Sequence, residues 1–96
     1  MNARIERLQN DLIFFRENVN RLSWESNPAN KTNIRKYKIY RKPIGASEDD
    51  YVALGEVSGN TFFYDDRGLR SDEFYSYRIT SIDIYDQESE PVVVSN

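Results

Sequence analysis

The side chains that could carry chemistry in this chain are carboxylates, hydroxyls, amines and guanidinium groups, because it contains neither cysteine nor histidine. The lack of histidine removes the commonest general base and the commonest metal ligand together. The lack of cysteine excludes a thiol nucleophile, a thiolate metal site and a disulfide framework. These two absences exclude more classes of function than any other feature of the composition.

The most regular polar pattern is a run of basic and aromatic residues at alternate positions, formed by Lys36, Lys38, Tyr40 and Lys42. Alternate residues of a strand share a face, and Arg78 should project from the same sheet. Basic groups interleaved with an aromatic ring could hold a sulfated glycan, a phosphate-rich polymer or an acidic protein face. The alternative is a solvated sheet face, whose lysines protect against edge pairing and pair with neighbours such as Glu56.

Carboxylates gather at Glu48-Asp49-Asp50, at Asp65-Asp66, and at Asp83 with Asp86 and Glu88. Calcium takes roughly six to eight converging oxygens. None of these runs matches the calcium loop, which also needs a glycine and a distal glutamate. We interpret them as solvated loops and predict no metal.

Catalytic arrangements are equally unsupported by the sequence. Two carboxylates can cleave glycosides, but they need a cleft that raises one carboxyl pKa, and a small filled domain offers none. Ser23, Ser76 and Ser89 lack a histidine or a placed lysine as a base. The four scattered glycines form no phosphate-binding loop. We therefore predict that the chain is not an enzyme and has no cofactor.

The elements that position these residues are predicted to be short strands. Turn-forming residues cluster at 27–33, 43–50, 58–60, 65–68 and 83–87. The intervening segments predict strands over 19–25, 34–42, 51–57, 61–64, 74–82 and 91–95. With the N-terminal segment these make seven strands. Their inward faces predict a core of ten residues: Leu22, Trp24, Tyr37, Ile39, Leu54, Leu69, Tyr75, Tyr77, Ile79 and Val93.

Residues 3–16 allow two interpretations. Ile5, Leu8, Leu12 and Phe15 recur at a spacing typical of one face of a helix. Against a helix, Asn10-Asp11 interrupts the run, and Ile13-Phe14 would place apolar bulk off that face. We favour a bent first strand, over 4–9 and then 12–16, kinked near Asn10.

The residues that carry a family resemblance are spread along nearly the whole chain. Leu69 precedes Tyr75 by six positions, and Tyr75, Tyr77 and Ile79 then alternate. Together with Arg21-Leu22-Ser23-Trp24 and Tyr37-Lys-Ile39-Tyr40-Arg41, this order resembles a fibronectin type III domain. The phrase Ile79-Thr-Ser-Ile-Asp83, followed by Glu88-Ser89 and a valine-rich strand, resembles the bacterial form.

The resemblance implies an all-β, seven-stranded, two-sheet Greek-key sandwich of the immunoglobulin-like kind, with Trp24 anchoring the core. It also implies a tyrosine corner, in which the phenol of Tyr75 packs inward and its hydroxyl bonds a backbone group upstream. The chain departs from the family pattern at four positions. Ser71 and Asp72 replace a frequent proline and glycine, Asp86 replaces a usual glycine, and Asn20 replaces a valine. Arg67-Gly68 continues to Leu69, so the integrin-binding Arg-Gly-Asp tripeptide is absent.

Composition and resemblance together give the functional expectation. The 96 residues suit one domain, 1–96, which we interpret as a piece of a longer protein. The net charge of −3 argues against nucleic-acid partners, and no apolar run is long enough to insert in a membrane. The resemblance implies a non-catalytic structural or protein-interaction module of a bacterial surface or secreted protein, extracytoplasmic and monomeric by itself.

The partner, protein or glycan, is not identified by the sequence. The alternative function is an accessory domain of an extracellular polysaccharide-degrading enzyme, with weak contact to a glycan or polyanion. The candidate partner-binding face comprises Lys36, Lys38, Tyr40, Lys42, Arg78 and Tyr85. Tyr85 stands apart in the last loop, where it could contact a partner or equally cap the end of the core.

Overall fold

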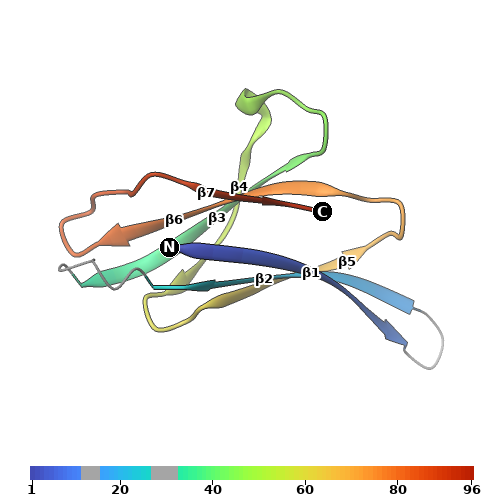
Figure 1. The fold of residues 1–96 in the computed structure, drawn as a ribbon, viewed down its shortest axis with the longest axis horizontal. Coiled ribbons are helices and arrows are strands. Elements are labelled where there is room, and N and C mark those ends of the chain that lie inside the picture. The colour runs from blue at the N-terminus through green and yellow to red at the C-terminus, as the bar shows by residue number, and fades with distance from the viewer. Residues whose placement is uncertain (12–15, 27–32) are drawn as a thin grey trace.

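Two antiparallel sheets stacked on each other form the molecule (Figure 1). The computed structural model describes residues 1–11, 16–26 and 33–96. The smaller sheet has the order β1-β2-β5 and the larger sheet β4-β3-β6-β7. The strands are β1 (Asn2–Asp11), β2 (Arg16–Glu25), β3 (Ile34–Pro43), β4 (Val52–Ser58), β5 (Phe63–Leu69), β6 (Tyr75–Asp83) and β7 (Val92–Ser95), with one 3-10 turn, η1 (Glu48–Asp50). The predicted seven-stranded all-β sandwich is confirmed.

The chain passes between the sheets after β2, β4 and β5, which gives the Greek-key connectivity. The strands that follow each other within one sheet, β1 and β2, β3 and β4, and β6 and β7, pair as antiparallel hairpins. β1 and β7, which belong to different sheets, also lie against each other. The seven strands therefore enclose one hydrophobic core.

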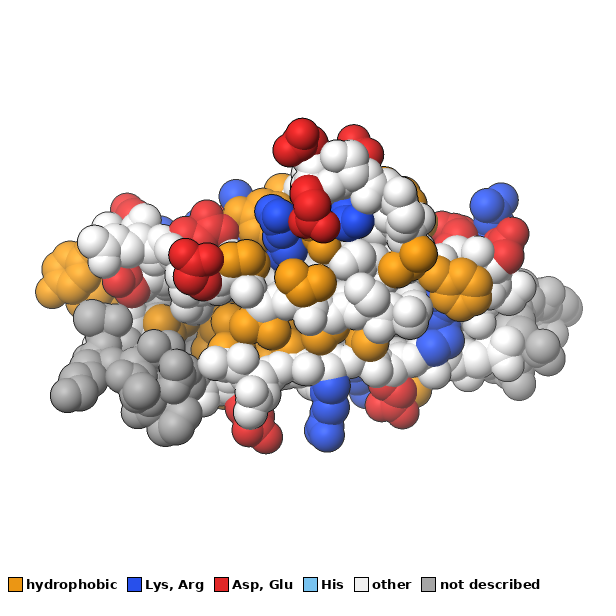
Figure 2. All heavy atoms as spheres, turned by 45° about the horizontal axis from the view of Figure 1, so that its top comes forward, with side chains coloured by type: hydrophobic (Ala, Val, Ile, Leu, Met, Phe, Trp, Pro, Cys, Tyr) orange, Lys and Arg blue, Asp and Glu red, His pale blue; other side chains and the backbone are white. Residues whose placement is uncertain are grey.

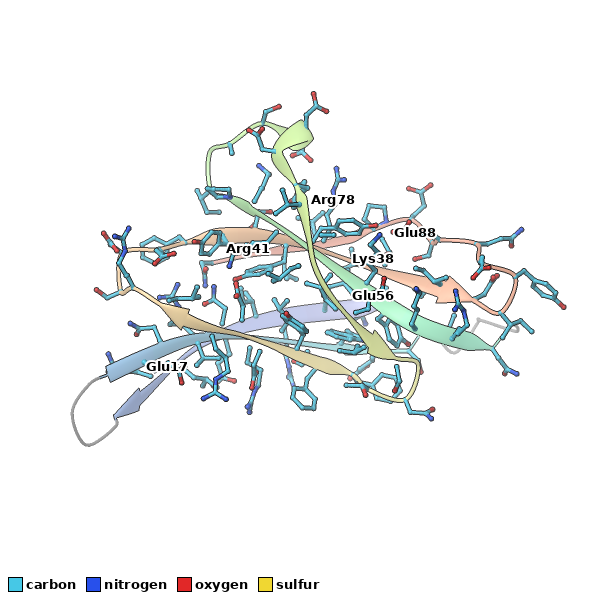
Figure 3. The ribbon with its side chains drawn as sticks, turned by 180° about the vertical axis from the view of Figure 1, so that it is seen from behind. Glu17, Lys38, Arg41, Glu56, Arg78 and Glu88 are labelled. Carbon is cyan, nitrogen blue, oxygen red and sulfur yellow. The ribbon has the colours of Figure 1, made fainter. Side chains whose placement is uncertain are left out.

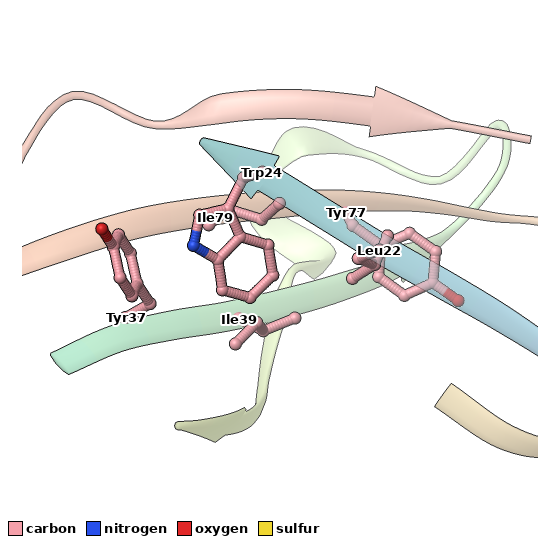
Figure 4. Close-up of a cluster of buried hydrophobic side chains, with 6 residues drawn as sticks. All are labelled: Leu22, Trp24, Tyr37, Ile39, Tyr77 and Ile79. Atoms are coloured by element: carbon pink, nitrogen blue, oxygen red, sulfur yellow. The ribbon is translucent and has the colours of Figure 1, made fainter. Parts of the chain in front are cut away.

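The centre of the core is built from alternate residues of three strands (Figure 4). β2 contributes Leu22 and Trp24, β3 contributes Tyr37 and Ile39, and β6 contributes Tyr77 and Ile79. The Trp24 and Tyr37 rings pack with their centroids 5.3 Å apart. Complete burial of such an apolar side chain is worth about 1.5–3 kcal/mol. All six were predicted as core from their alternation.

The remaining core predictions have mixed outcomes. Leu69 is buried, and Leu54 and Tyr75 are partly buried and pack against the centre. Val93 was predicted as core, and this is wrong, because its side chain is 54% exposed. Val92 to Val94 form a uniform apolar run, so the sequence does not fix which residue points inward. Pairing of Val94 with Tyr77 settles the register and turns Val94 toward the core.

The N-terminal segment forms more strand than the sequence predicted. β1 spans Asn2–Asp11 and pairs with β2 along its whole length, up to Asp11 opposite Arg16. The helical alternative is therefore wrong for residues 2–11. The bent first strand was also wrong at residue 16, which begins β2, and residues 12–15 lie outside the described residues. Of the four residues with helix-like spacing, Ile5 and Leu8 belong to β1, and Leu12 and Phe15 lie outside the described residues.

The predicted turn at 65–68 is also wrong. Asp65 and Asp66 belong to β5, opposite Arg21 and Asn20 of β2, and the predicted strand 61–64 is displaced to Phe63–Leu69. Asp65 forms two hydrogen bonds of 2.8 Å with the Arg21 guanidinium. Gly68 has a φ of 70° and lies where the β2–β5 register shifts, so the turn-like composition marks an irregular strand.

A buried polar cluster ties the two sheets together. The Tyr77 hydroxyl of β6 donates to Asp66 Oδ2 at 2.6 Å and accepts from Asn20 Nδ2 at 2.8 Å. Arg41 Nη1 of β3 donates to the same Asp66 oxygen at 2.9 Å. In the sequence, Asn20 was noted only because it replaces a valine of the family pattern. In the structure it is completely buried. Its amide is satisfied by partners, as a buried polar group requires.

The tyrosine corner differs from the expected arrangement. The Tyr75 hydroxyl donates to the carboxylate of Glu73, a side chain two positions upstream, and no backbone acceptor is found for it among the described residues. Tyr77, not Tyr75, is the completely buried tyrosine of β6. Tyr75 instead lies at the core edge, under the Arg41 guanidinium, 4.2 Å from the ring centroid.

Candidate functional site

The larger sheet carries most of the predicted partner-binding residues on its outer face. Lys38 lies opposite Thr80 and Tyr40 opposite Arg78, so β3 and β6 present these side chains on the same side of the sheet. Lys38 and Arg78 of this set are labelled in Figure 3. Lys36 precedes them along β3, opposite Ile82. The structure therefore brings together Lys36, Lys38, Tyr40 and Arg78, as the alternation predicted.

The cations of this face have acidic neighbours within the domain. Lys36 Nζ lies 2.8 Å from Glu56 Oε2, and this pairing lowers the Glu56 pKa. Arg78 Nη2 lies 3.1 Å from Glu48 Oε2, and its guanidinium stacks 4.2 Å from the Tyr51 ring centroid. Figure 2 likewise shows acidic and basic side chains interspersed. The expected pairing of Glu56 across strands is confirmed, and the face is internally compensated.

Lys38 has one aromatic ring, that of Tyr40, and two carboxylates, those of Glu56 and Glu88, as neighbours. Its Nζ lies 5.1 Å from the Tyr40 ring centroid. Figure 3 shows it near Glu56 and Glu88. The Tyr40 hydroxyl, followed by these carboxylates, raises the pKa of Lys38.

Lys42 does not join the accessible face. It is only 8% exposed, because the connection between β3 and β4, which contains η1, folds over it. Its ammonium donates to the Ala46 carbonyl at 2.7 Å and lies 5.5 Å from the Tyr51 ring centroid. The Tyr51 hydroxyl reaches Ser76 Oγ at 2.7 Å on β6. Alternation gave Lys42 the correct face but could not reveal that a loop covers it.

Tyr85 lies in the β6–β7 connection, is 69% exposed, and is not among the residues brought together on the sheet face. The turn that holds it is well defined. Asp83 Oδ1 accepts from the backbone amides of Tyr85 at 2.8 Å and Gln87 at 3.0 Å. Asp86 has a φ of 61°, at the position where the sequence lacked an expected glycine. The core-cap interpretation of Tyr85 is not compatible with its exposure.

A carboxylate held by two hydroxyl groups is the most organised polar feature of the outer face. Glu88 Oε2 accepts from the Tyr40 hydroxyl at 2.6 Å and from Thr80 Oγ1 at 2.7 Å. These two bonds lower the pKa of Glu88, so it is an anion at neutral pH. Burial, followed by the bond to Glu88, raises the pKa of Tyr40.

A shallow groove surrounds this carboxylate. We call it the Glu88 groove, and its lining consists of Tyr40, Arg78, Thr80, Glu88, Ser89 and Pro91. The segment leading to β7 is fixed against β6: the Ser89 amide donates to the Ser81 carbonyl at 2.8 Å, and Ser89 Oγ accepts from the Ser81 amide at 2.9 Å. The groove is therefore formed before any ligand arrives.

Sequence reasoning found Tyr40 and Arg78 of this groove but missed Thr80, Glu88, Ser89 and Pro91. Thr80 could have been found, because the alternation that places Arg78 outward places Thr80 outward as well. Glu88 was assigned to a solvated acidic loop. Its role depends on the return of the chain over β6, with Glu88 paired to Ile82, which no local pattern encodes.

The other residues considered for chemistry form no comparable arrangement. Ser23 Oγ accepts from Arg4, and Ser76 Oγ contacts Tyr51 and Ser95. Among the described residues, no group of three or more acidic side chains could hold a metal ion. Over the same parts of the chain, no helix has the length and apolar character needed to cross a membrane.

Comparison with known proteins gives matches in structure but not in sequence. The chain matches no model of a known protein family and no curated protein sequence. It is similar in structure to part of the pectate lyase PelI from Erwinia chrysanthemi, solved in complex with tetragalacturonic acid, with a TM-score of 0.71 and 14% identity. It is also similar to part of the pectate lyase Pel3 from Pectobacterium carotovorum, with a TM-score of 0.72 and 16% identity.

These similarities concern the fold alone. All of the chain is covered in both comparisons, but it spans only 28% of the PelI chain and 26% of the Pel3 chain. The same two-sheet architecture is therefore found as a fraction of two larger proteins.

Proposed function

We propose that residues 1–96 form a non-catalytic structural and interaction module, a fibronectin type III-like domain of bacterial type, within a longer extracytoplasmic protein. The observation that carries the proposal is the filled interior: Leu22, Tyr37, Ile39, Tyr77 and Ile79 are at most 1% exposed and occupy the space between the sheets. A module of this kind acts through its surface. The strand order and the buried Trp24 of β2 support the family assignment.

The placement of the chain ends supports a spacing role. Asn2 pairs with Glu25, at the end of the sandwich where Trp24 lies. Asn96 is bonded through its backbone amide to the Tyr75 carbonyl, where β6 begins, which is the other end of the same stack. Neighbouring segments would then leave the module from opposite ends. The buried Asn20 also bonds Asn96 Oδ1 at 2.9 Å, which fixes the exit of the last strand.

A second candidate is an accessory domain of an extracellular polysaccharide-degrading enzyme. The observation that favours it is that the structural neighbours are pectate lyases, in which about a quarter of the chain has this fold. In this role the module would help a catalytic neighbour to reach a polymer, without performing the reaction.

Two measurements test these candidates. The isolated chain should release no product from polygalacturonate or from neutral polysaccharides, and turnover of any of them would contradict a non-catalytic role. In the parent protein, deletion of 1–96 should leave turnover of a small soluble substrate unchanged under both candidates. The accessory role additionally predicts a lower rate on the polymer, which replacement by an inert spacer domain should not restore.

A further inference from the structure

The Glu88 groove has the properties of a ligand subsite, not of an ordinary solvated patch. Both hydroxyl donors of Tyr40 and Thr80 are directed at one oxygen, Glu88 Oε2. The second oxygen, Oε1, accepts no hydrogen bond from any described residue. The lining thus presents an ionised hydrogen-bond acceptor of fixed orientation. Because the carboxylate is already ordered, binding of a ligand that donates to it would carry only a small entropic cost for ordering the site.

The charges around the groove offer an anion no clear surplus of positive charge, because even Lys38, beside the Tyr40 ring, has Glu88 and Glu56 as its acidic neighbours. Its lining contains one carboxylate, Glu88, and one guanidinium, Arg78, which already has Glu48 as its partner at 3.1 Å. Lys36 is similarly occupied by Glu56 at 2.8 Å. A polyanion would have to compete with these carboxylates and would also be repelled by Glu88. Unfavourable charges of this kind determine specificity as strongly as attractive contacts do.

The composition of the lining suits a ligand that both donates and accepts hydrogen bonds. Tyr40, Thr80 and Ser89 bring hydroxyls, Glu88 an acceptor and Arg78 donors, while the exposed Pro91 adds apolar surface. Sugar hydroxyls can donate to the carboxylate and accept from the guanidinium, and the C–H faces of a sugar ring can rest on the proline. We propose that the Glu88 groove binds an uncharged, hydroxyl-rich glycan. This proposal rests on the proposed non-catalytic role of the domain. It differs from the sequence-based expectation, in which the alternating lysines suggested a polyanionic ligand.

The test is a titration of the isotope-labelled chain, followed by the NMR shifts of its backbone amides. The probes are soluble galactan, arabinan and hydroxyethylcellulose, with polygalacturonate as the anionic comparison. At least one neutral polymer should shift the amides of Tyr40, Thr80, Glu88 and Ser89. The titration should extend to about 10 mM in sugar residues, so that a dissociation constant as weak as about 1 mM is detected.

Matched variants assign the binding to the groove. Glu88→Ala should weaken binding at least about tenfold, as expected for loss of a hydrogen bond to a charged group. Thr80→Val should weaken binding less, because it keeps the Glu88 carboxylate and removes only one of the two hydrogen bonds that orient it. Glu56→Ala is the control, since it removes an exposed carboxylate of the same sheet outside the groove lining, and it should leave binding unchanged. Unchanged Trp24 fluorescence and thermal unfolding would establish that each variant is folded.

Three results would overturn the proposal: no shift with any of the neutral polymers, binding of polygalacturonate alone, or an affinity unaffected by Glu88→Ala in a folded variant. None of these would contradict the non-catalytic role, which is tested separately by turnover and by deletion from the parent protein.

Discussion

At the scale of single residues, the hydroxyl of Tyr77 makes the most demanding contacts in the molecule. It lies in the completely buried region, donates to Asp66 and accepts from Asn20. Burial and the bond to Asp66 raise the pKa of Tyr77. The neutral phenol is therefore the form that the folded chain requires.

We predict that Tyr77→Phe lowers the free energy of unfolding by about 1–3 kcal/mol, because it leaves Asp66 and Asn20 with an unmet hydrogen bond in a buried site. Tyr40→Phe, which removes a hydroxyl from the exposed face, should cost less than about 1 kcal/mol. Urea unfolding followed by Trp24 fluorescence measures both. Equal costs would show that the buried cluster does not stabilise the fold more than a surface bond does.

Trp24 contributes through packing alone. It is 4% exposed, and its indole Nε1 is buried without a hydrogen-bond partner among the described residues. We predict a cost of about 3–5 kcal/mol for Trp24→Ala, the range for removal of a large buried aromatic side chain. Trp24→Phe should cost clearly less, because the contact with Tyr37 persists and no hydrogen bond is lost. Circular dichroism during thermal unfolding measures both, and similar costs for the two variants would contradict a packing role.

At the scale of elements, the turn between β4 and β5 depends on close approach of two backbones. The Gly59 amide donates to the Arg35 carbonyl at 3.0 Å. A Cβ at position 59 would lie 2.0 Å from the Ile34 carbonyl oxygen, which cannot move without moving β3. Only glycine fits this contact, although the turn itself tolerates other residues.

We therefore predict that Gly59→Ala lowers the free energy of unfolding by about 1–3 kcal/mol, the cost of overpacking. The control is Gly68→Asn in β5. Gly68 has positive φ, but a Cβ added there would meet no atom within 4 Å. Asparagine adopts this conformation readily, so a cost below about 1 kcal/mol is expected. Chemical denaturation measures the free energy of unfolding of both variants. A greater loss of stability for Gly68→Asn than for Gly59→Ala would mean that backbone strain, and not steric contact, determines the need for glycine.

At the scale of the whole molecule, charge pairing sets the response to pH. Hydrogen bonds and ion pairs in the folded state lower the pKa values of Glu56, Asp65, Glu73 and Glu88 below 4.5 for glutamate and 3.8 for aspartate. A lowered folded-state pKa gives stability that is present above the unfolded-state value and is lost as pH falls through the folded-state value. Tyr37, Tyr40, Tyr64, Tyr75 and Tyr77 have pKa values raised above 10.0, and their contribution is lost at high pH.

We predict a plateau of stability around neutral pH that declines on both sides. The midpoint of urea unfolding should fall below about pH 4.5, as the paired carboxylates are protonated, and again above about pH 10, as unfolding releases the tyrosines. Glu88→Gln should reduce the acid decline and leave most of the alkaline decline, because Glu88 contributes to the raised pKa of Tyr40 but not to those of Tyr37, Tyr64, Tyr75 and Tyr77. A midpoint that stays constant from neutral pH to about pH 3 would contradict the role given to the carboxylates.

Local sequence pattern was sufficient to predict most of the strands and the centre of the core. Strict alternation at Leu22 and Trp24, at Tyr37 and Ile39, and at Tyr77 and Ile79 can be satisfied only by strands with one buried face. The same alternation placed Lys36, Lys38, Tyr40 and Arg78 on one outer face. These features are local, because each depends only on the two-residue repeat of an extended chain.

Features that depend on register, or on loops that return over a sheet, required the assembled fold. Val93 faces outward because pairing with β6 sets the phase of a uniform valine run. Lys42 is covered by the connection between β3 and β4, and Asp66 is buried by a cluster drawn from both sheets. Glu88 becomes the centre of a groove because the chain folds back onto β6. These contacts join residues distant along the chain, so their free energies exist only once the two sheets have come together.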